Sequence, residues 1–147
     1  MKIREINEND LTGLLELYTE LHDNAIPKID ENLIKLWSEI LHDKNHHIIV
    51  AEEDGRIVSS CVIVIVPNLT HNQRPYAFVE NVVTAAQFRR LGLAQRCLDY
   101  AKDIAVRANC YKIMLMTGSK QDGVIAFYEK AGFNKTDKTG FVQWLNP

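Results

Sequence analysis

The stretch that decides the fold is NVVTAAQFRRLGLAQRCLDYAKDIA (residues 81–105), which begins as a strand and ends as a helix. Its first residues are typical of a strand, and from about Gly92 apolar residues recur at helical spacing. Between the two lie residues 89–94, which are basic and then small. The first turn of a helix leaves backbone N–H groups without partners and carries a partial positive charge, so it can bind an anion. By itself this hexapeptide fits a phosphate-binding turn or an ordinary surface turn.

The residue types in this turn suit a close approach of phosphate to the backbone. Gly92 has no side chain and Ala94 has only a methyl group, so neither would block a ligand. Arg89 can add a charge-assisted hydrogen bond from the rim, and Arg90 can do the same or stay solvated. The turn follows its strand without a long loop, which places the helix start at the carboxyl end of the strand, where α/β folds bind ligands.

The size and charge of the chain limit its class. Its 147 residues, 46% hydrophobic and 24% charged, predict a single globular domain over residues 1–147. The formal net charge of -2 gives no overall attraction for nucleic acid or an anionic membrane, so we expect neither as a partner. The first residues lack the apolar stretch of a signal peptide, and no segment approaches ~18 apolar residues, which favours a cytoplasmic protein.

The three cysteines, Cys61, Cys97 and Cys110, stand far apart in the chain and form no CxxC pair. The cysteines and histidines show no zinc-ligand spacing either, so we expect no metal. Cys61 lies in a run of valines and isoleucines, which is typical of a buried structural thiol. We therefore expect reduced thiols in the core.

The remaining elements follow from periodicity and turn signals. Asp54-Gly55 between two β-rich runs predicts a hairpin, and Asp30 is a candidate helix cap. The expected strands are 2–6, the two arms of the hairpin, 76–84, 111–117 and a closing pair within 133–145; the expected helices are 11–21, 33–41, one from about 92, and 122–132. This order predicts a mixed α/β fold with a partly antiparallel, partly parallel central sheet and helices on both faces. A Rossmann unit is disfavoured because the first strand–helix turn lacks its glycine fingerprint.

Two motifs resemble those of the GNAT superfamily, the acyl-CoA-dependent N-acetyltransferases. Motif A of that family reads Arg/Gln-x-x-Gly-x-Gly/Ala and matches Arg89, Gly92 and Ala94. Further along, AFYEKAGF (residues 126–133) resembles motif B, which commonly reads FYxKxGF. Two motifs in the family's order are more specific than either alone, and the flanking elements fit the family over nearly the whole chain.

The resemblance implies a splayed central sheet with acetyl-CoA as co-substrate. Its pantetheine arm would lie between the strands that hold ENVVT and KIMLMT, paired with the backbone of Val82 and Val83. Phe127 is a further candidate cofactor contact, with a core role as the alternative. The pyrophosphate would be held by the turn, with Arg89 at the rim and backbone amides from Arg90, Leu91, Gly92, Leu93 and Ala94.

The sequence departs from the commonest family wording in two places. Arg90-Leu91 stands where Gly-Lys is frequent, and the contacts there are mostly from the backbone. Many members also carry an asparagine after the second splayed strand. Here the nearest polar residues are Thr117, Ser119 and Lys120, which leaves that contact open.

Direct acetyl transfer needs a neutral amine, donors for the oxyanion and a proton for the departing thiolate. Tyr128 stands at the family's catalytic tyrosine position and is the candidate acid, with a core role as the alternative. Glu80 is the candidate base, directly or through water, and a solvated carboxylate is the alternative. His71 is the other candidate base, because its ordinary pKa near ~6.5 suits the task. Asn81 could orient the substrate or satisfy backbone groups.

The predicted function is transfer of an acetyl group from acetyl-CoA directly to a primary amine of a small molecule. The alternatives are a catalytically silent acyl-CoA-binding module and an acetyltransferase of protein N-termini or lysines. The C-terminal half also resembles glucosamine-phosphate N-acetyltransferases. By resemblance the first two helices and the loop 67–75 would shape the acceptor pocket, where Asp23, Asp30 and Glu31 could attract a cationic amine or act as caps. A homodimer is compatible with such folds.

Overall fold

The computed structural model describes residues 1–21 and 25–146. Asp23, named above as a candidate for the acceptor side, lies outside the described residues. The strands are β1 (Lys2–Glu5), β2 (His46–Glu53), β3 (Arg56–Val66), β4 (Tyr76–Thr84) and β5 (Ile113–Leu115). The helices are α1 (Leu11–Tyr18), α2 (Glu31–His42), α3 (Thr70–Gln73), α4 (Leu93–Arg107) and α5 (Asp122–Lys130), with 3-10 turns at Glu8–Asp10 and Ala86–Phe88. Within these ranges no helix has the length and apolar character needed to cross a membrane.

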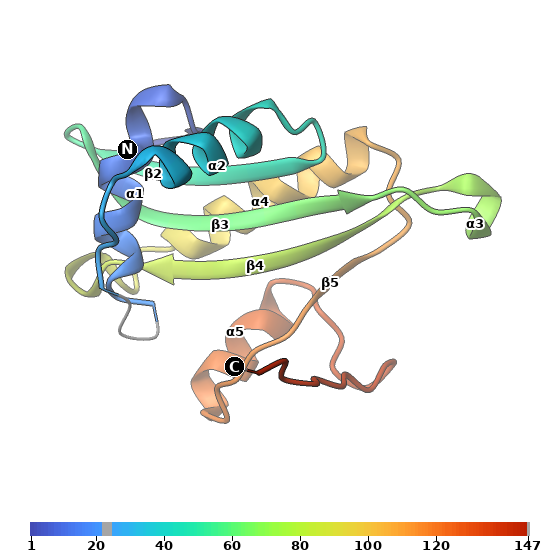
Figure 1. Ribbon diagram of the computed structural model, residues 1–147. Helices are drawn as coiled ribbons and strands as arrows, with labels where there is room; N and C mark the ends of the chain where they lie inside the picture. The colour runs from blue at the N-terminus through green and yellow to red at the C-terminus, as the bar shows by residue number, and fades with distance from the viewer. Residues whose placement is uncertain (22–24, 147) are drawn as a thin grey trace.

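The sheet is mixed, as the sequence predicted. Its strands follow chain order, β1-β2-β3-β4-β5 (Figure 1). The first three pairings are antiparallel, and β4 pairs with β5 in parallel across the crossover through α4. The β2–β3 hairpin turns at Asp54-Gly55, where φ is 50 and 77, the left-handed conformation that this dipeptide favours.

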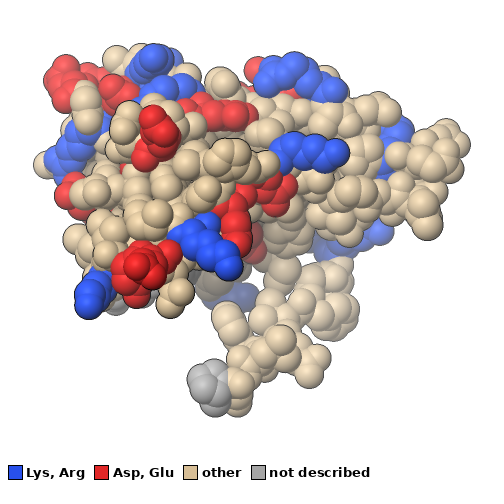
Figure 2. All heavy atoms as spheres, turned by 45° about the horizontal axis from the view of Figure 1, so that its top comes forward, with Lys and Arg blue, Asp and Glu red and all other residues tan. Residues whose placement is uncertain are grey.

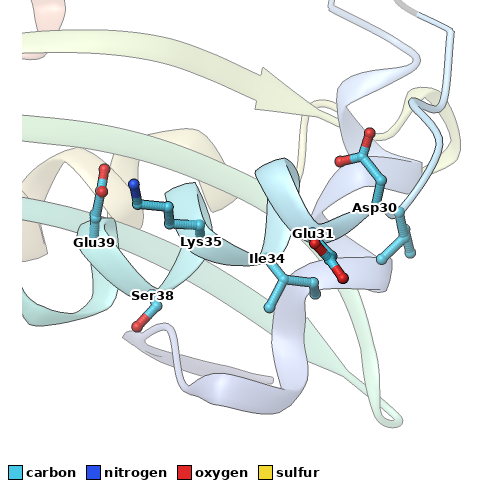
Figure 3. A pocket seen from close by; sticks show the side chains of 7 residues that line it. Asp30, Glu31, Ile34, Lys35, Ser38 and Glu39 are labelled. Atoms are coloured by element: carbon cyan, nitrogen blue, oxygen red, sulfur yellow. The ribbon is translucent and has the colours of Figure 1, made fainter.

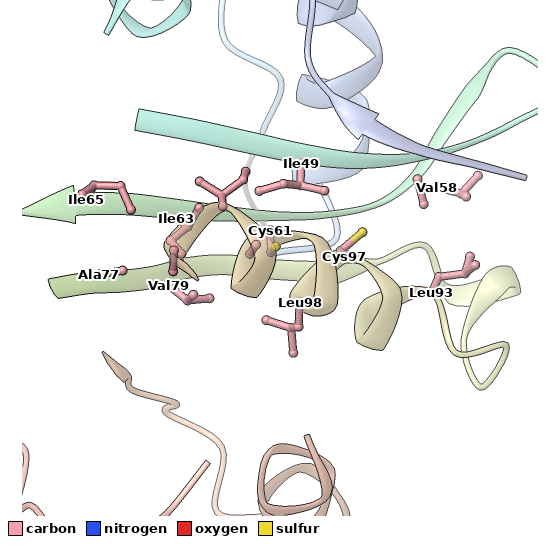
Figure 4. Packing of buried hydrophobic residues seen from close by; sticks show 14 residues of the cluster. Ile49, Val58, Cys61, Ile63, Ile65, Ala77, Val79, Leu93, Cys97 and Leu98 are labelled. Atoms are coloured by element: carbon pink, nitrogen blue, oxygen red, sulfur yellow. The ribbon is translucent and has the colours of Figure 1, made fainter. Parts of the chain in front are cut away.

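Two apolar clusters, one on each face of the sheet, form the core. Strand residues such as Ile49 and Ile63 pack against the buried stripe of α4, which includes Cys97 and Leu98 (Figure 4). The opposite cluster joins Ile48 and other strand residues to side chains of α1 and α2. Helices therefore cover both faces, and the long helix runs as its periodicity predicted.

The predicted closing pair of strands within residues 133–145 is wrong. Residues 134–146 form neither strand nor helix, and all of them are exposed. The composition of FVQWL favours a strand, but β-propensity becomes structure only where a strand edge is available for pairing. In this chain the edge strand β5 has only three residues, so its outer side offers the segment a short edge for pairing.

A network of charged side chains joins the 3-10 turn Glu8–Asp10 to strands β1 and β2. The guanidinium of Arg4 donates to both carboxylate oxygens of Asp10, at 2.6 and 2.9 Å, and to Glu52 Oε2 at 2.6 Å. The backbone N–H of Asn7 donates to the same Asp10 carboxylate at 2.7 Å. Burial acts to raise the pKa of Asp10, but the hydrogen bonds from Arg4 and Asn7 and the charge of Arg4 outweigh it, so the pKa lies below its ordinary 3.8.

We expect Asp10→Asn to lower the free energy of unfolding by roughly 2 kcal/mol, because it leaves a charged, part-buried partner under-satisfied. Since the folded-state pKa is lowered, the contribution of Asp10 is present above about pH 4 and is lost as pH falls through that lower pKa. Urea unfolding between pH 7 and pH 2.5 measures the free energy of unfolding and its dependence on pH. Asp54→Asn in the exposed hairpin turn is the control and should change neither quantity. An equal loss of unfolding free energy in that variant would contradict the stabilising role of Asp10.

Candidate active site

A β-bulge lies in the middle of β4. Val62 pairs with Glu80 and Ser60 pairs with Val83, so Asn81 and Val82 together oppose Cys61. Asn81 has a φ of 52. The extra residue reverses the alternation of side chains along the strand. Val79 packs on the α4 side of the sheet, whereas Val83 packs on the α1 and α2 side. Bulges of this kind re-aim side chains and are frequent beside active sites; here Glu80 and Asn81 are both exposed in succession.

A cavity of about 230 Å³ lies where β4 and β5 separate. The two strands pair over residues 77–79 and 113–115 and then diverge, with α5 beside them (Figure 1). Both strands, the segments after β5 and after α1, and α5 contribute lining residues. They are Leu21, Val79, Glu80, Asn81, Val82, Leu115, Met116, Thr117, Gly118, Ser119, Val124 and Tyr128. The structure thus brings Glu80, Val82 and Tyr128 together at one splayed point of the sheet.

Tyr128 is held in place by aromatic neighbours. Its ring lies 5.1 Å from the ring of Phe127 and 6.2 Å from that of Phe133, both in edge-on geometry. The hydrogen bond from Phe133 N–H to the Tyr128 carbonyl closes the end of α5, where Gly132 has a φ of 101. Burial raises the pKa of the Tyr128 phenol, and Cys61 adds to that rise. The hydroxyl is therefore protonated over the neutral range and can donate.

Tyr18, which the sequence did not single out as a site residue, lies behind the cavity wall and contacts the bulge. Burial raises the pKa of Tyr18 to about 12, and the side chains of Ser60 and Asn81 lie near enough to its hydroxyl to oppose that rise. The bulge residue Asn81 is thus supported from α1. The hydroxyl of Thr117 accepts from Ser119 N–H at 3.2 Å and fixes the turn after β5. A polar group on the buried stripe of α1 was the available signal for Tyr18.

The turn of residues 89–94 has an unusual backbone. Arg90 and Gly92 have φ values of 63 and 77, and α4 begins directly after Gly92 without a side-chain cap. Left-handed residues beside a helix start turn successive N–H groups into a concave, anion-binding arrangement. A Cβ atom built on Gly92 would meet no other atom within 4 Å, so the space in front of the turn is open. Arg89 Nε donates to the Thr84 carbonyl at 3.1 Å, which ties the turn to the end of β4.

The other cofactor candidates flank the cavity. Val82 lines it, and the carbonyl of Val83 accepts a hydrogen bond from Ser59 Oγ at 3.1 Å on the β3 side. The side chain of Val83 is buried against α1 and α2. Phe127 is half-buried and packs against the core cluster of α4. The core alternative for Phe127 therefore has direct contacts, and Val82 packs against the same cluster while also lining the cavity.

Three residues expected near the acceptor, His71, Asp30 and Glu31, lie outside the cavity wall. His71 lies in α3, in the segment that precedes β4, and its ring centroid is 3.9 Å from that of Tyr111; no residue of this segment lines the cavity. Asp30 caps α2 by accepting from Leu33 N–H at 2.9 Å. Asp30 and Glu31 border a shallow hollow of about 730 Å³ on the outer side of α2 (Figure 3). That hollow shares no lining residue with the cavity, and its exposed carboxylates are explained by capping and solvation.

The cysteines are free thiols, and Cys61 and Cys97 are buried as expected. Burial raises the pKa of Cys61 and raises that of Cys97 to about 11. Cys110 is half-buried, and burial raises the pKa of its thiol as well. Thiols with raised pKa values are poor nucleophiles at neutral pH. The candidate catalytic groups of the cavity are therefore its oxygen-bearing side chains.

A splayed sheet, a basic helix-start turn and a tyrosine at the split together define a class of acyl-CoA-dependent transferases. The model of the acetyltransferase (GNAT) family matches residues 11–133. The chain therefore belongs to the GNAT family, as its two motifs predicted, and it is an acetyl-CoA-dependent N-acetyltransferase.

Individual relatives agree with this assignment. A solved structure from Agrobacterium tumefaciens str. C58, to which an acetyltransferase function has been ascribed, is 40% identical, with a TM-score of 0.92 over 99% of this chain and 100% of that one. Glucosamine 6-phosphate N-acetyltransferase of Trypanosoma brucei brucei is 29% identical and matches 94% of this chain and 92% of its own length. The enzyme of the same name from Arabidopsis thaliana is 27% identical over 90% and 89% of the two chains.

Proposed function

We propose that residues 1–147 form one acetyltransferase domain that moves the acetyl group of acetyl-CoA directly onto the primary amine of a small molecule. The cavity at the split between β4 and β5 carries this proposal, because it joins a carboxylate, a strand edge and a protonated phenol in one place. A direct transfer needs no enzyme nucleophile, which agrees with thiols that are held protonated by burial.

For the cofactor, we assign the diphosphate to the turn of residues 89–94 and the pantetheine arm to the open edge of β4. The left-handed residues Arg90 and Gly92 present successive N–H groups. Val82 is the stronger candidate for pairing with the arm, because the Val83 carbonyl is already engaged on the β3 side. Phe127 is assigned a supporting contact beside Tyr128.

For the chemistry, Glu80 removes a proton from the ammonium form of the acceptor, directly or through water. The neutral nitrogen attacks the acetyl carbon, the C–N bond forms, the C–S bond breaks, and the nitrogen loses its second proton to solvent to give the neutral amide. Tyr128 gives its proton to the departing thiolate and regains one from solvent. Asn81, supported by Tyr18, holds the bulge that places Glu80 at the cavity. Positioning both substrates in line contributes a further share of the rate.

The residues that line the cavity limit the class of amine that can act as the acceptor. Among the described lining residues there is one carboxylate, Glu80, and no lysine or arginine, so the wall suits a cationic amine. Two curated relatives act on glucosamine 6-phosphate, which makes an amino-sugar phosphate the first acceptor to test. The phosphate of such a substrate would need a cation outside this wall, and Lys120 directly follows the lining residue Ser119.

The function is tested by incubating the protein with acetyl-CoA and a panel of amines, with thiol release and product mass as readouts. The panel contains glucosamine 6-phosphate, glucosamine, a polyamine and a lysine peptide. We expect release with at least one small amine. Binding of acetyl-CoA by calorimetry without release for any amine would favour a silent acyl-CoA-binding module. Release with the peptide alone would favour a protein acetyltransferase.

We expect Glu80→Gln to lower kcat/KM about 100-fold at neutral pH, since general-base catalysis typically contributes 10²–10⁴. The deficit should narrow as the pH approaches the pKa of the acceptor amine, because the amine then loses its proton without help. A pH–rate profile of both proteins measures this. His71→Ala, outside the cavity wall, is the control and should follow the unmodified protein. A deficit that is constant at every pH would assign Glu80 to positioning, and a larger loss in the histidine variant would reverse the two roles.

A further inference from the structure

The end of α1 contacts the connection between β4 and α4, residues 85–92 (Figure 1). Glu20, two residues beyond α1, accepts a hydrogen bond from the backbone N–H of Ala86 at 2.9 Å. The face of the molecule visible in Figure 2 carries interspersed acidic and basic side chains, so an exposed carboxylate is not by itself a sign of function. What distinguishes Glu20 is a partner 66 residues further along the chain, in the connection that leads to the turn of residues 89–94.

The N–H of Ala86 needs an acceptor from outside its own segment. Ala86 begins the 3-10 turn Ala86–Phe88, and the preceding residue, Ala85, forms no side-chain cap. The first N–H groups of a helical turn have no partner within the turn. The carboxylate of Glu20 supplies that partner, and a charged acceptor makes such a hydrogen bond stronger than a neutral acceptor would.

The residues on either side of Glu20 belong to the surroundings of the cavity. The N–H groups of Glu20 and Leu21 donate to carbonyls of the last turn of α1, at 3.1 and 3.0 Å, so both residues continue the end of that helix. Leu21 lines the cavity, and Tyr18 contacts the bulge residue Asn81. Glu20 therefore joins the part of the chain that contributes Leu21 to the part that leads to α4.

We propose that Glu20 is a positioning residue for the acceptor amine. Its hydrogen bond to Ala86 fixes the end of α1 against the connection between β4 and α4, and it thereby sets the position of Leu21 in the cavity wall. This inference rests on the proposed function, because that function places the amine in the cavity.

The two sides of this hydrogen bond depend on it to different degrees. The connection keeps other anchors: Ala85 N–H donates to the Val58 carbonyl of β3 at 2.9 Å, and Phe88 N–H donates to the Ala85 carbonyl at 2.8 Å. Leu21 instead follows Glu20 directly in the chain. Loss of the bond should therefore displace the wall at Leu21 more than the turn that is assigned to the cofactor.

We expect Glu20→Ala to raise KM for the amine about 10-fold, the factor that corresponds to one hydrogen bond to a charged group. Both kcat and the affinity for acetyl-CoA should stay within about two-fold, because Glu80 and the cofactor turn keep their own supports. Glu20→Gln keeps an oxygen acceptor and should recover most of the loss. Glu16→Ala is the control, because Glu16 is also exposed but lies one turn earlier on α1. A role in stability alone would lower the free energy of unfolding and leave KM unchanged.

Ala86→Pro removes the donor of the same hydrogen bond. Proline suits the first position of a helical turn, and Ala85, with φ -55 and ψ 136, already has the extended conformation that a residue before proline takes. We expect this variant to raise KM for the amine by a similar factor. The double variant of Glu20→Ala with Ala86→Pro should be no worse than either single one, because both changes remove one bond. An unchanged KM in Glu20→Ala, or losses that multiply to about 100-fold in the double variant, would overturn the proposal.

Hydrogen–deuterium exchange, which needs no turnover, separates a failure of this inference from a failure of the proposed function. Amides of the peptide that holds residues 17–21 should exchange faster in Ala86→Pro than in the unmodified protein, and the sequence of this peptide is the same in both. Glu20→Ala should show the same increase, and Glu16→Ala should not. If no amine releases thiol, the proposed function fails and exchange alone decides whether Glu20 positions the end of α1. Equal exchange in the unmodified protein and all three variants would overturn that role.

Discussion

Replacing Tyr128 by phenylalanine should lower kcat by roughly 100- to 1,000-fold, the usual share of a general acid, and leave the affinity for acetyl-CoA within about two-fold. The variant keeps the ring that contacts Phe127 and Phe133, so α5 and the cavity wall should persist. It removes the one phenol among the described lining residues. Because burial raises the pKa of Tyr128 above its ordinary 10, the unmodified enzyme should not lose this proton below about pH 10.

Stopped-flow kinetics measures kcat, and calorimetry measures the affinity for acetyl-CoA. Tyr111→Phe is the matched control, because Tyr111 is also half-buried but stacks on His71 outside the cavity wall. A second readout is an acetyl thioester whose thiol has a low pKa: its thiolate leaves without a proton, so the deficit of Tyr128→Phe should shrink. Near-normal turnover in Tyr128→Phe, or a deficit equal for both thioesters, would remove Tyr128 from the role of acid.

The sequence was sufficient to predict those helices, strands and turns whose local signals agree with the overall fold. The run of strand-forming residues from Tyr76 ends at Thr84, and the periodic stripe after Gly92 fixes α4. Asp30 and Asp54-Gly55 likewise took the capping and turn positions that their side chains favour. In each case the residues that specify the element lie within it, so a window of the sequence contains the necessary information.

The remainder depends on contacts between distant parts of the chain. The bulge at Asn81 arises from the register between β4 and β3, which a single strand does not encode. The support of Asn81 by Tyr18 likewise requires α1 to lie across the sheet. The closing strands were predicted from composition, yet residues 134–146 pair with no strand of their own chain. Two motifs carry the candidates Tyr128 and residues 89–94, and Glu80 and Val82 were proposed from the strand that precedes the first motif, whereas the shape of the cavity could not be predicted.

Gly92→Val should weaken the binding of CoA and acetyl-CoA about 100-fold while leaving kcat at saturating acetyl-CoA nearly unchanged. The left-handed φ of 77 at Gly92 turns the N–H groups of the helix start outward, and a β-branched residue strains that conformation by ~1–3 kcal/mol. The new side chain would also project into the open space in front of the turn. Both effects act on the phosphate end of the cofactor and not on the acetyl end. Gly92→Val should therefore raise KM for acetyl-CoA with little change in kcat, whereas Tyr128→Phe should lower kcat with little change in affinity for acetyl-CoA.

Gly55 provides the control, because it has the same φ of 77 and the same open space but lies in the β2–β3 hairpin turn. Gly55→Val should lose a similar amount of unfolding free energy in urea and keep its affinity for CoA by calorimetry. Salt adds a further criterion: the affinity of the unmodified protein should fall with ionic strength, since an anion is held by N–H groups and arginine, and the residual affinity of Gly92→Val should fall less. If the two valine variants bound CoA alike, the weakening would be due to general strain, and the diphosphate would have to lie elsewhere than on residues 89–94.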